Sequence, residues 1–149
     1  MSENTDRRWA FGSALHVENP GVGKFHVNGL HTGIELLKTQ QNLLVGSIPA
    51  PNIHEGWKIK SALILYNIRG PVGLIDKIGI RNGYIDLHRF ENLTIGPNAS
   101  WELKQLDLPG PTAFAYSLGI TIHVWVPDNP DVTPPIQFLF TGIGLEFTK

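Results

Sequence analysis

Hydrophobic and polar residues alternate along several stretches of this chain, as they do in strands that bury one face. In residues 116–126 every second residue is large and apolar, and the residues between them are mostly small or polar. Side chains of a strand point alternately to its two faces, so this stretch predicts a strand with one face in the core. The opposite face would carry Ser117, Gly119, Thr121, His123 and Trp125.

Two further stretches depart from simple alternation. Residues 59–68 are apolar at both sets of alternate positions, which indicates a central strand covered on both faces. In residues 136–147 the large side chains shift from one set of positions to the other around Gly142 and Gly144. Such a shift, next to glycine, predicts a β-bulge.

Turn signals separate these stretches at intervals of roughly eight to twelve residues, a spacing typical of β-sandwiches and barrels. The chain has 16 Gly and 11 Pro, spread along its length. We predict an all-β fold, an antiparallel β-sandwich resembling a jelly roll, with about nine to ten strands. The predicted strands are 14–18, 34–37, 43–48, 59–68, 74–80, 84–90, 101–106, 116–126 and 136–147. A short helix from Thr32, where Thr-Gly-Ile-Glu has the form of a capping box, is the alternative to the second strand.

Asn82-Gly83 is the strongest turn signal, because this pair readily adopts the positive φ angles of a type I′ hairpin turn. The predicted hairpin pairs Arg81 with Tyr84 and Asp76 with Arg89. Its core face would carry Ile78, Ile80, Ile85 and Leu87. Its outer face would gather Lys77, Arg81, Tyr84, Asp86 and His88.

The amino-acid composition is typical of a protein built from β-strands. The net charge bears on which partners the protein can bind. The chain has 15 Ile and 9 Thr against 7 Ala, which favours strands over helices. The formal net charge is -1, so we expect no nucleic-acid partner. There is no apolar run long enough to span a bilayer, no signal-peptide core after the polar first residues, and no Cys. We therefore expect a flexible N-terminus at 1–8, a single sandwich domain at 9–149, no membrane partner and a cytoplasmic location.

Four segments distributed over nearly the whole chain resemble a bacterial family of single-domain β-sandwich proteins that has no agreed function. These segments are 9–14 (Trp-Ala-Phe-Gly-Ser-Ala) leading to 18–20 (Glu-Asn-Pro), 47–51 (Ser-Ile-Pro-Ala-Pro), 117–122 (Ser-Leu-Gly-Ile-Thr-Ile) and 140–147 (Phe-Thr-Gly-Ile-Gly-Leu-Glu-Phe). They consist of strand and turn residues. The resemblance thus implies the sandwich fold and no particular chemistry.

Six histidines raise the question of a metal site: His16, His26, His31, His54, His88 and His123. No pair has the His-x-His spacing, and Asp86 with His88 supplies two ligands where a zinc site needs at least three protein groups. We expect no metal and no cofactor. Residues 128–131 (Asp-Asn-Pro-Asp) are typical turn formers, and calcium binding by their oxygen atoms stays open as the alternative.

The polar positions on the hairpin and on the 116–126 strand form the candidate site. The predicted ligand-binding residues are Lys77, Arg81, Tyr84, Asp86, His88, His123 and Trp125. They predict a small-ligand or carbohydrate-binding, lectin-like protein without a cofactor. One alternative is a cofactor-free isomerase or cyclase acting on a hydrophobic small molecule inside the sandwich, with Asp86 and His88 as the candidate catalytic pair. The other is a structural or assembly protein, and a homo-oligomer stays open.

Overall fold

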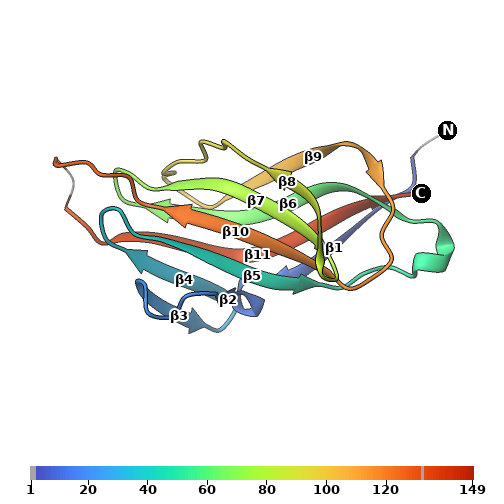
Figure 1. Cartoon of the computed structure of the whole chain (residues 1–149), viewed down its shortest axis with the longest axis horizontal. Helices are drawn as coiled ribbons and strands as arrows, with labels where there is room; N and C mark the ends of the chain where they lie inside the picture. The colour runs from blue at the N-terminus through green and yellow to red at the C-terminus, as the bar shows by residue number, and fades with distance from the viewer. Residues whose placement is uncertain (1–2, 132) are drawn as a thin grey trace.

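The computed structural model describes residues 3–131 and 133–149, which form two antiparallel β-sheets packed face to face (Figure 1). Sheet A contains β1 (Thr5–Phe11), β3 (Lys24–Asn28), β4 (His31–Leu36), β6 (Lys58–Arg69), β9 (Glu102–Thr112) and β11 (Ile136–Thr148). Sheet B contains β2 (His16–Val17), β5 (Gln41–Ile48), β7 (Leu74–Asn82), β8 (Ile85–Phe90) and β10 (Leu118–Trp125). Two single-turn 3-10 helices, η1 (Gly12–Ala14) and η2 (Ile53–Glu55), lie in connections. The prediction of an antiparallel β-sandwich is confirmed, with 11 strands.

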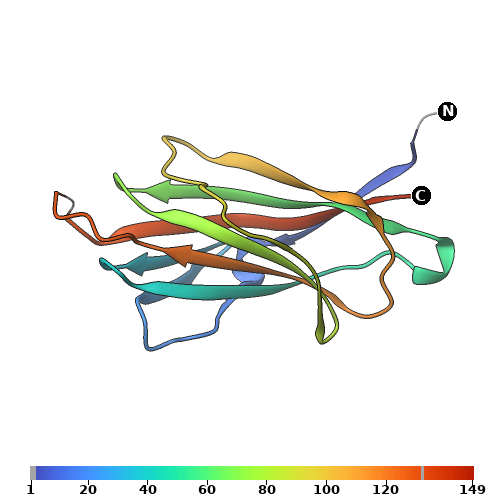
Figure 2. The ribbon, with the colours of Figure 1, turned by 45° about the horizontal axis from the view of Figure 1, so that its top comes forward.

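The long strand β11 organises sheet A, whose order is β3-β4-β11-β6-β9. The first part of β11 pairs with β4 and the second part with β1, while β6 runs along its other edge. Sheet B has the order β2-β5-β10-β7-β8. The strands of both sheets run along the long axis of the molecule, and η2 lies at the end where β11 finishes (Figures 1 and 2). Within the described residues, no helix is long and apolar enough to cross a membrane.

The core between the sheets consists mainly of aliphatic and phenylalanine side chains. Strand β10 buries alternate residues from Leu118 to Val124 and leaves the residues between them partly exposed, as the sequence predicted. Sheet A contributes the fully buried rings of Phe138, Phe140 and Phe147. Burying a side chain of this size stabilises the fold by about 1.5–3 kcal/mol, so the inward face of each strand is fixed by its apolar residues.

Two strands were not predicted. Strand β3 pairs only with β4 and is largely polar, and β1 has no apolar alternation because its sequence mixes charged and aromatic residues. Residues 5–8, expected to be flexible, instead pair with β11 from Thr5 opposite Thr148 to Arg8 opposite Leu145. An ion pair of 2.7 Å between Arg7 Nε and Glu146 Oε2 reinforces this pairing. The helix alternative is also settled, since Thr32 belongs to strand β4.

The predicted bulge in the last strand is confirmed. Phe140 pairs with Tyr66 and Gly142 with Leu65, so Thr141 is an extra residue in β11. The glycines that follow accommodate Trp9 of β1. A Cβ atom on Gly144 would lie 2.9 Å from Cε3 of the Trp9 ring, a distance that needs something to shift, so a larger residue there would displace the ring.

The β7–β8 hairpin does not have the register that we predicted. Arg81 was expected opposite Tyr84, and the structure pairs it with Asp86. The turn consists of Gly83 and Tyr84, and Leu87 is an extra residue that forms a bulge in β8. Positive φ is needed only at Gly83, where it is 62°.

The side chain of Asn82 explains the shifted turn. Its Oδ1 atom accepts hydrogen bonds from the backbone N–H groups of Ala115 (3.3 Å) and Tyr116 (2.8 Å). Asn82 also pairs with Leu118 of the neighbouring strand β10. Asn82 is therefore held in strand β7 by a segment more than thirty residues away, and the turn forms one position later.

Replacing a buried phenylalanine should test the packing of the two sheets. We expect Phe140→Ala to lower the free energy of unfolding by about 3–5 kcal/mol, because it leaves a cavity between the sheets. Urea unfolding followed by tryptophan fluorescence measures this change. The matched control is Phe11→Ala, at a ring that is 62% exposed, with an expected change within about 0.5 kcal/mol. Equal losses in the two variants would contradict this description of the core.

Candidate functional site

The outer face of sheet B is hollowed where β10 and β7 run side by side. Thr121 of β10 pairs with Gly79 of β7, and Gly119 pairs with Arg81. Gly79, Gly119 and Thr121 are small, whereas Lys77, Arg81 and His123 on the same face have longer side chains. The resulting hollow has a volume of about 400 Å³. Its lining includes Glu18, Lys77, Arg81, Asp86, Arg89 and His123.

Four of the seven predicted site residues meet in this hollow: Lys77, Arg81, Asp86 and His123. Two come from β7, one from β8 and one from β10. They share a face because apolar residues at the intervening positions of β7 and β10 are buried in the core. His123 lies directly opposite Lys77 in the register of the two strands.

The ion pairs of the hollow are unequal. Asp86 Oδ2 accepts hydrogen bonds from both Nε (3.0 Å) and Nη2 (2.6 Å) of Arg89. Arg81 Nε lies 3.7 Å from Asp86 Oδ1, beyond hydrogen-bond distance. This Nε atom is buried and has no hydrogen-bond partner within the described part of the chain. Arg89 therefore donates both hydrogen bonds to Asp86, and Arg81 makes only a longer ionic contact with it.

His123 forms one end of the hollow and is fixed on both sides. Its Nδ1 atom contacts the carboxylate of Asp76, and its Nε2 atom lies 3.0 Å from Oε1 of Gln41. The side chains of His123 and Asp76 are both mostly buried. The ring of His123 therefore has a fixed orientation, and both of its nitrogen atoms have partners within the protein.

Three predicted site residues lie elsewhere. Tyr84 is at the tip of the hairpin, 79% exposed, with its ring 6.1 Å from that of Tyr116. Trp125 is the last residue of β10 and does not line the hollow. His88 pairs with the buried Ile80, and its ring packs 4.6 Å from that of Phe90.

The bulge at Leu87 separates the proposed catalytic pair. In a regular strand Asp86 and His88 would point to the same face. Here Asp86 pairs with Arg81 on the outer face, whereas His88 pairs with Ile80 on the core face. The two side chains are therefore not placed to move a proton between them.

Two residues of the site, Asp76 and Arg89, were not predicted from the sequence. Each reaches the outer face of sheet B at a β-bulge. Regular alternation would put Asp76 and Arg89 at the end of the core face of the hairpin. Asp76 is the extra residue where β7 shifts register against β10, and it contacts His123 on the outer side. The bulge in β8 brings Arg89 opposite Gly79. No local feature of the sequence indicates either bulge.

A smaller hollow of about 250 Å³ adjoins the first one. Its lining includes Val45, Ser47, Ser117, Gly119 and Arg81. Arg81 lines both hollows, so they meet at this side chain. We refer to the two hollows together as the sheet B groove. Arg81 occupies its middle.

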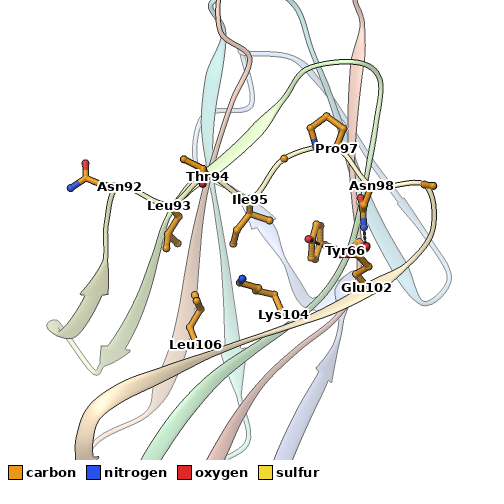
Figure 3. Close-up of a pocket in the computed structure, with 12 residues that line it drawn as sticks. Tyr66, Asn92, Leu93, Thr94, Ile95, Pro97, Asn98, Glu102, Lys104 and Leu106 are labelled. Atoms are coloured by element: carbon orange, nitrogen blue, oxygen red, sulfur yellow. Dashed lines mark hydrogen bonds between the residues drawn. The ribbon is translucent and has the colours of Figure 1, made fainter.

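A separate and larger cavity, of about 720 Å³, lies between β9 and the connection from β8 to β9 (Figure 3). The connection is held in place by Asn98, whose Oδ1 accepts a hydrogen bond of 2.7 Å from the backbone N–H of Ile68. Glu102 and Lys104 of the edge strand β9 point toward this cavity (Figure 3). Inward charges on an edge strand discourage pairing with another chain, which gives these two residues a structural role.

Tyr66 closes the inner side of this cavity. Its hydroxyl donates a hydrogen bond of 3.3 Å to Oε2 of Glu102. Burial raises the pKa of the Tyr66 phenol above its ordinary value, and the negative charge of Glu102 adds to the rise. The phenol therefore stays protonated in the folded protein to a higher pH than in the unfolded chain.

Metal ligation has no support in the described residues. Within 3–131 and 133–149 there is no group of three or more His, Asp or Glu side chains that could hold a metal ion. In the loop considered for calcium, the backbone N–H of Asp131 donates to Oδ1 of Asn129 at 3.0 Å. This local hydrogen bond is typical of a turn.

Comparisons with solved structures relate the sandwich to known proteins. No protein-family model and no curated protein matches the sequence. A mutant of a family 29 carbohydrate-binding module matches 96% of this chain and 92% of its own, with a TM-score of 0.54 and 14% identity. The fold is that of carbohydrate-binding modules. A mutant of CBM29-2 complexed with cellulohexaose matches with a TM-score of 0.54 and 13% identity, covering 95% of this chain and 91% of that one. A further family 29 module matches with a TM-score of 0.53 and 13% identity, over 96% and 89% of the two chains.

The raised pKa of Tyr66 leads to a pH-dependent stability. Its stabilising contribution is complete below the phenol's unfolded pKa of about 10 and is lost as pH rises through the higher folded pKa. We expect the free energy of unfolding to fall above about pH 10, and Tyr66→Phe to reduce that slope. Urea unfolding from about pH 9 to pH 11 measures it. Tyr116→Phe, at an exposed ring, is the control and should keep the slope. An unchanged slope in Tyr66→Phe would disprove the effect.

Proposed function

We propose that this protein binds carbohydrate through the sheet B groove. The observation that carries the proposal is a groove lined by charged and hydroxyl side chains on the outer face of a sandwich that has the fold of carbohydrate-binding modules. The fold alone would not decide a function. The chemistry of the groove supplies the second part of the argument.

The groove offers the groups that hydroxyl-rich ligands require. Sugar hydroxyls both donate and accept hydrogen bonds, so their sites combine the two kinds of partner. Arg81 and Lys77 donate, and Asp86 accepts. Thr121, with its hydroxyl group, does both. Hydrogen bonds to charged groups are about twice as strong as neutral ones, which favours retention of a polar ligand in an open groove.

The floor of the groove suits a flat ring. Thr121 covers the buried Gly79, Gly119 is partly exposed, and Leu43 adds apolar surface at the edge. The apolar C–H face of a sugar ring can lie against such a floor while its hydroxyl groups reach the charged walls. The structure thus combines the two contacts that a carbohydrate site needs, an apolar surface and lateral hydrogen bonds.

The isomerase alternative loses its basis in this geometry. It required an apolar cavity inside the sandwich with Asp86, His88 or His123 at its wall. The space between the sheets is filled by side chains such as Phe138 and Phe140, and the pair lies on opposite faces of β8. A binding protein explains the groove with fewer assumptions.

An assembly role has one specific observation in its favour. On the outer face of sheet A, Trp9, Phe11 and Leu65 line a mainly apolar hollow of about 390 Å³. Apolar surface of this kind often lies in contacts between proteins. If it pairs two copies of the chain, Phe11→Ser should convert a dimer to a monomer in sedimentation velocity. A wild-type protein that sediments as a monomer across the concentration range rejects this candidate.

Isothermal titration calorimetry against neutral and acidic oligosaccharides tests the glycan proposal. We expect Arg81→Ala to weaken binding of the best ligand by about ten- to a hundredfold, because it removes a charged donor from the middle of the groove. Arg69→Ala is the matched control, since Arg69 lies at the end of β6 in the other sheet. The control should bind like the unmodified protein.

Two results would reject the proposal. One is a folded protein, shown by its circular dichroism spectrum, that binds no oligosaccharide of the panel. The other is tight binding that Arg81→Ala leaves unchanged, which would move the site away from the sheet B groove.

A further inference from the structure

We infer that the sheet B groove selects glycans that carry carboxylate groups, such as chains of uronic acids, over neutral glycans with the same backbone. This inference rests on the proposed carbohydrate binding and specifies its ligand class. It follows from the charges of the groove and from the contacts that each charge already makes.

The charged residues of the larger hollow favour an anionic ligand. Three cationic side chains, Lys77, Arg81 and Arg89, line it together with two carboxylates, Asp86 and Glu18. A further carboxylate, that of Asp76, contacts His123 at the end wall. The residues that line the hollow thus include one more cationic than anionic side chain, with the Asp76 carboxylate outside the lining and against His123.

Arg81 and Arg89 share the carboxylate of Asp86 unequally. Both hydrogen bonds to Oδ2 of Asp86 come from Arg89, at 3.0 and 2.6 Å. Arg81 Nε is 3.7 Å from the other oxygen of Asp86 and is buried without a hydrogen-bond partner among the described residues. An unpaired, buried N–H of a charged group is costly. The side chain of Arg81 as a whole is 42% exposed, so a ligand acceptor would meet its exposed part rather than Nε.

A carboxylate is the acceptor that fits a guanidinium group best. The planar fork of an arginine matches the two oxygens of a carboxylate, so that two parallel hydrogen bonds form. A neutral hydroxyl group offers one oxygen and no charge. Because the side chain of Arg81 is partly shielded from water, the difference between these two acceptors is larger than it would be at a fully exposed side chain.

The position of the cations indicates a ligand of more than one sugar ring. Arg81 lines both hollows of the groove, and its neighbours in the smaller hollow are uncharged. Lys77 lies four positions earlier on the same face of β7, which corresponds to about 13 Å along a strand. A chain of several uronic acid units can reach both cations, whereas a single ring fills one hollow.

Matched pairs of hexasaccharides test this inference. Each pair shares its backbone and differs in charge: β-1,4-linked glucuronate with cellohexaose, β-1,4-linked mannuronate with mannohexaose, and α-1,4-linked galacturonate with its methyl ester. Calorimetry should show, for at least one backbone, binding of the acidic member about tenfold tighter or more, the expected effect of one charge-assisted contact. The preference should shrink when salt rises from about 0.05 M to about 0.5 M, because salt screens exposed charges.

Substitutions of Arg81 test whether this side chain causes the preference for acidic over neutral hexasaccharides. Arg81→Gln should remove most of the preference, because the side chain keeps a donor but loses its charge and its fork. Arg81→Lys should retain part of it, since the charge remains. Arg69→Gln, in sheet A, is the control and should keep the full preference. Folding of each variant is verified by its unfolding curve.

The outcomes distinguish this inference from the function on which it rests. Binding of neutral hexasaccharides as tight as that of their acidic partners overturns the inference and leaves carbohydrate binding in place. A preference that survives in Arg81→Gln also overturns it. If the folded protein binds neither member of any pair, both the inference and the proposed function are rejected.

Discussion

The packing of the apolar face of sheet B against sheet A is the constraint on which the groove depends. Strands β7 and β10 bury Ile78, Ile80, Ile120 and Ile122 with almost no exposure, and these side chains fix the orientation of both strands. Because residues alternate between the two faces, every buried isoleucine also directs its neighbours outward. The packing of the core therefore determines which side chains of these strands face the groove. Its residues can differ in charge and size without disturbing the packing beneath them.

Two β-bulges interrupt the alternation of residues between the two faces of the sheet. Both change which charged side chains lie on the outer face. One bulge turns Asp76 from the core side to His123, and the other turns Arg89 to the outer face, where it holds Asp86. Each adds a partner to a residue already on the outer face. Asp86 accepts its hydrogen bonds from Arg89 and keeps only a 3.7 Å ionic contact with Arg81. The distribution of charge in the groove thus depends on strand irregularities as well as on the number of charged residues.

The likeness to carbohydrate-binding modules and the chemistry of the groove support each other but come from different levels of the structure. The likeness concerns the sandwich as a whole, at 13–14% identity to the family 29 modules, and therefore describes a scaffold. The groove belongs to this chain, and its arginines, glycines and fixed histidine are its own. An open polar groove over a filled core suits the binding of a ligand on the surface better than the conversion of a substrate inside the sandwich.

The sequence by itself determined the architecture. Alternation in residues 116–126, the shift of parity near Gly142 and the spacing of turns were sufficient for the sandwich, a central strand and one bulge, because burial acts on each strand through local pattern. It also placed Lys77, Arg81 and Asp86 on one face of the hairpin and His123 on the outer face of the 116–126 strand, and the pairing of β10 with β7 joined the two. Only the tertiary structure decided the register of the β7–β8 hairpin, the strand at β1 and the positions of Asp76, Arg89 and His88. These depend on contacts between distant segments, such as Asn82 with the N–H groups of residues 115 and 116, and the local pattern of a strand contains no information about them.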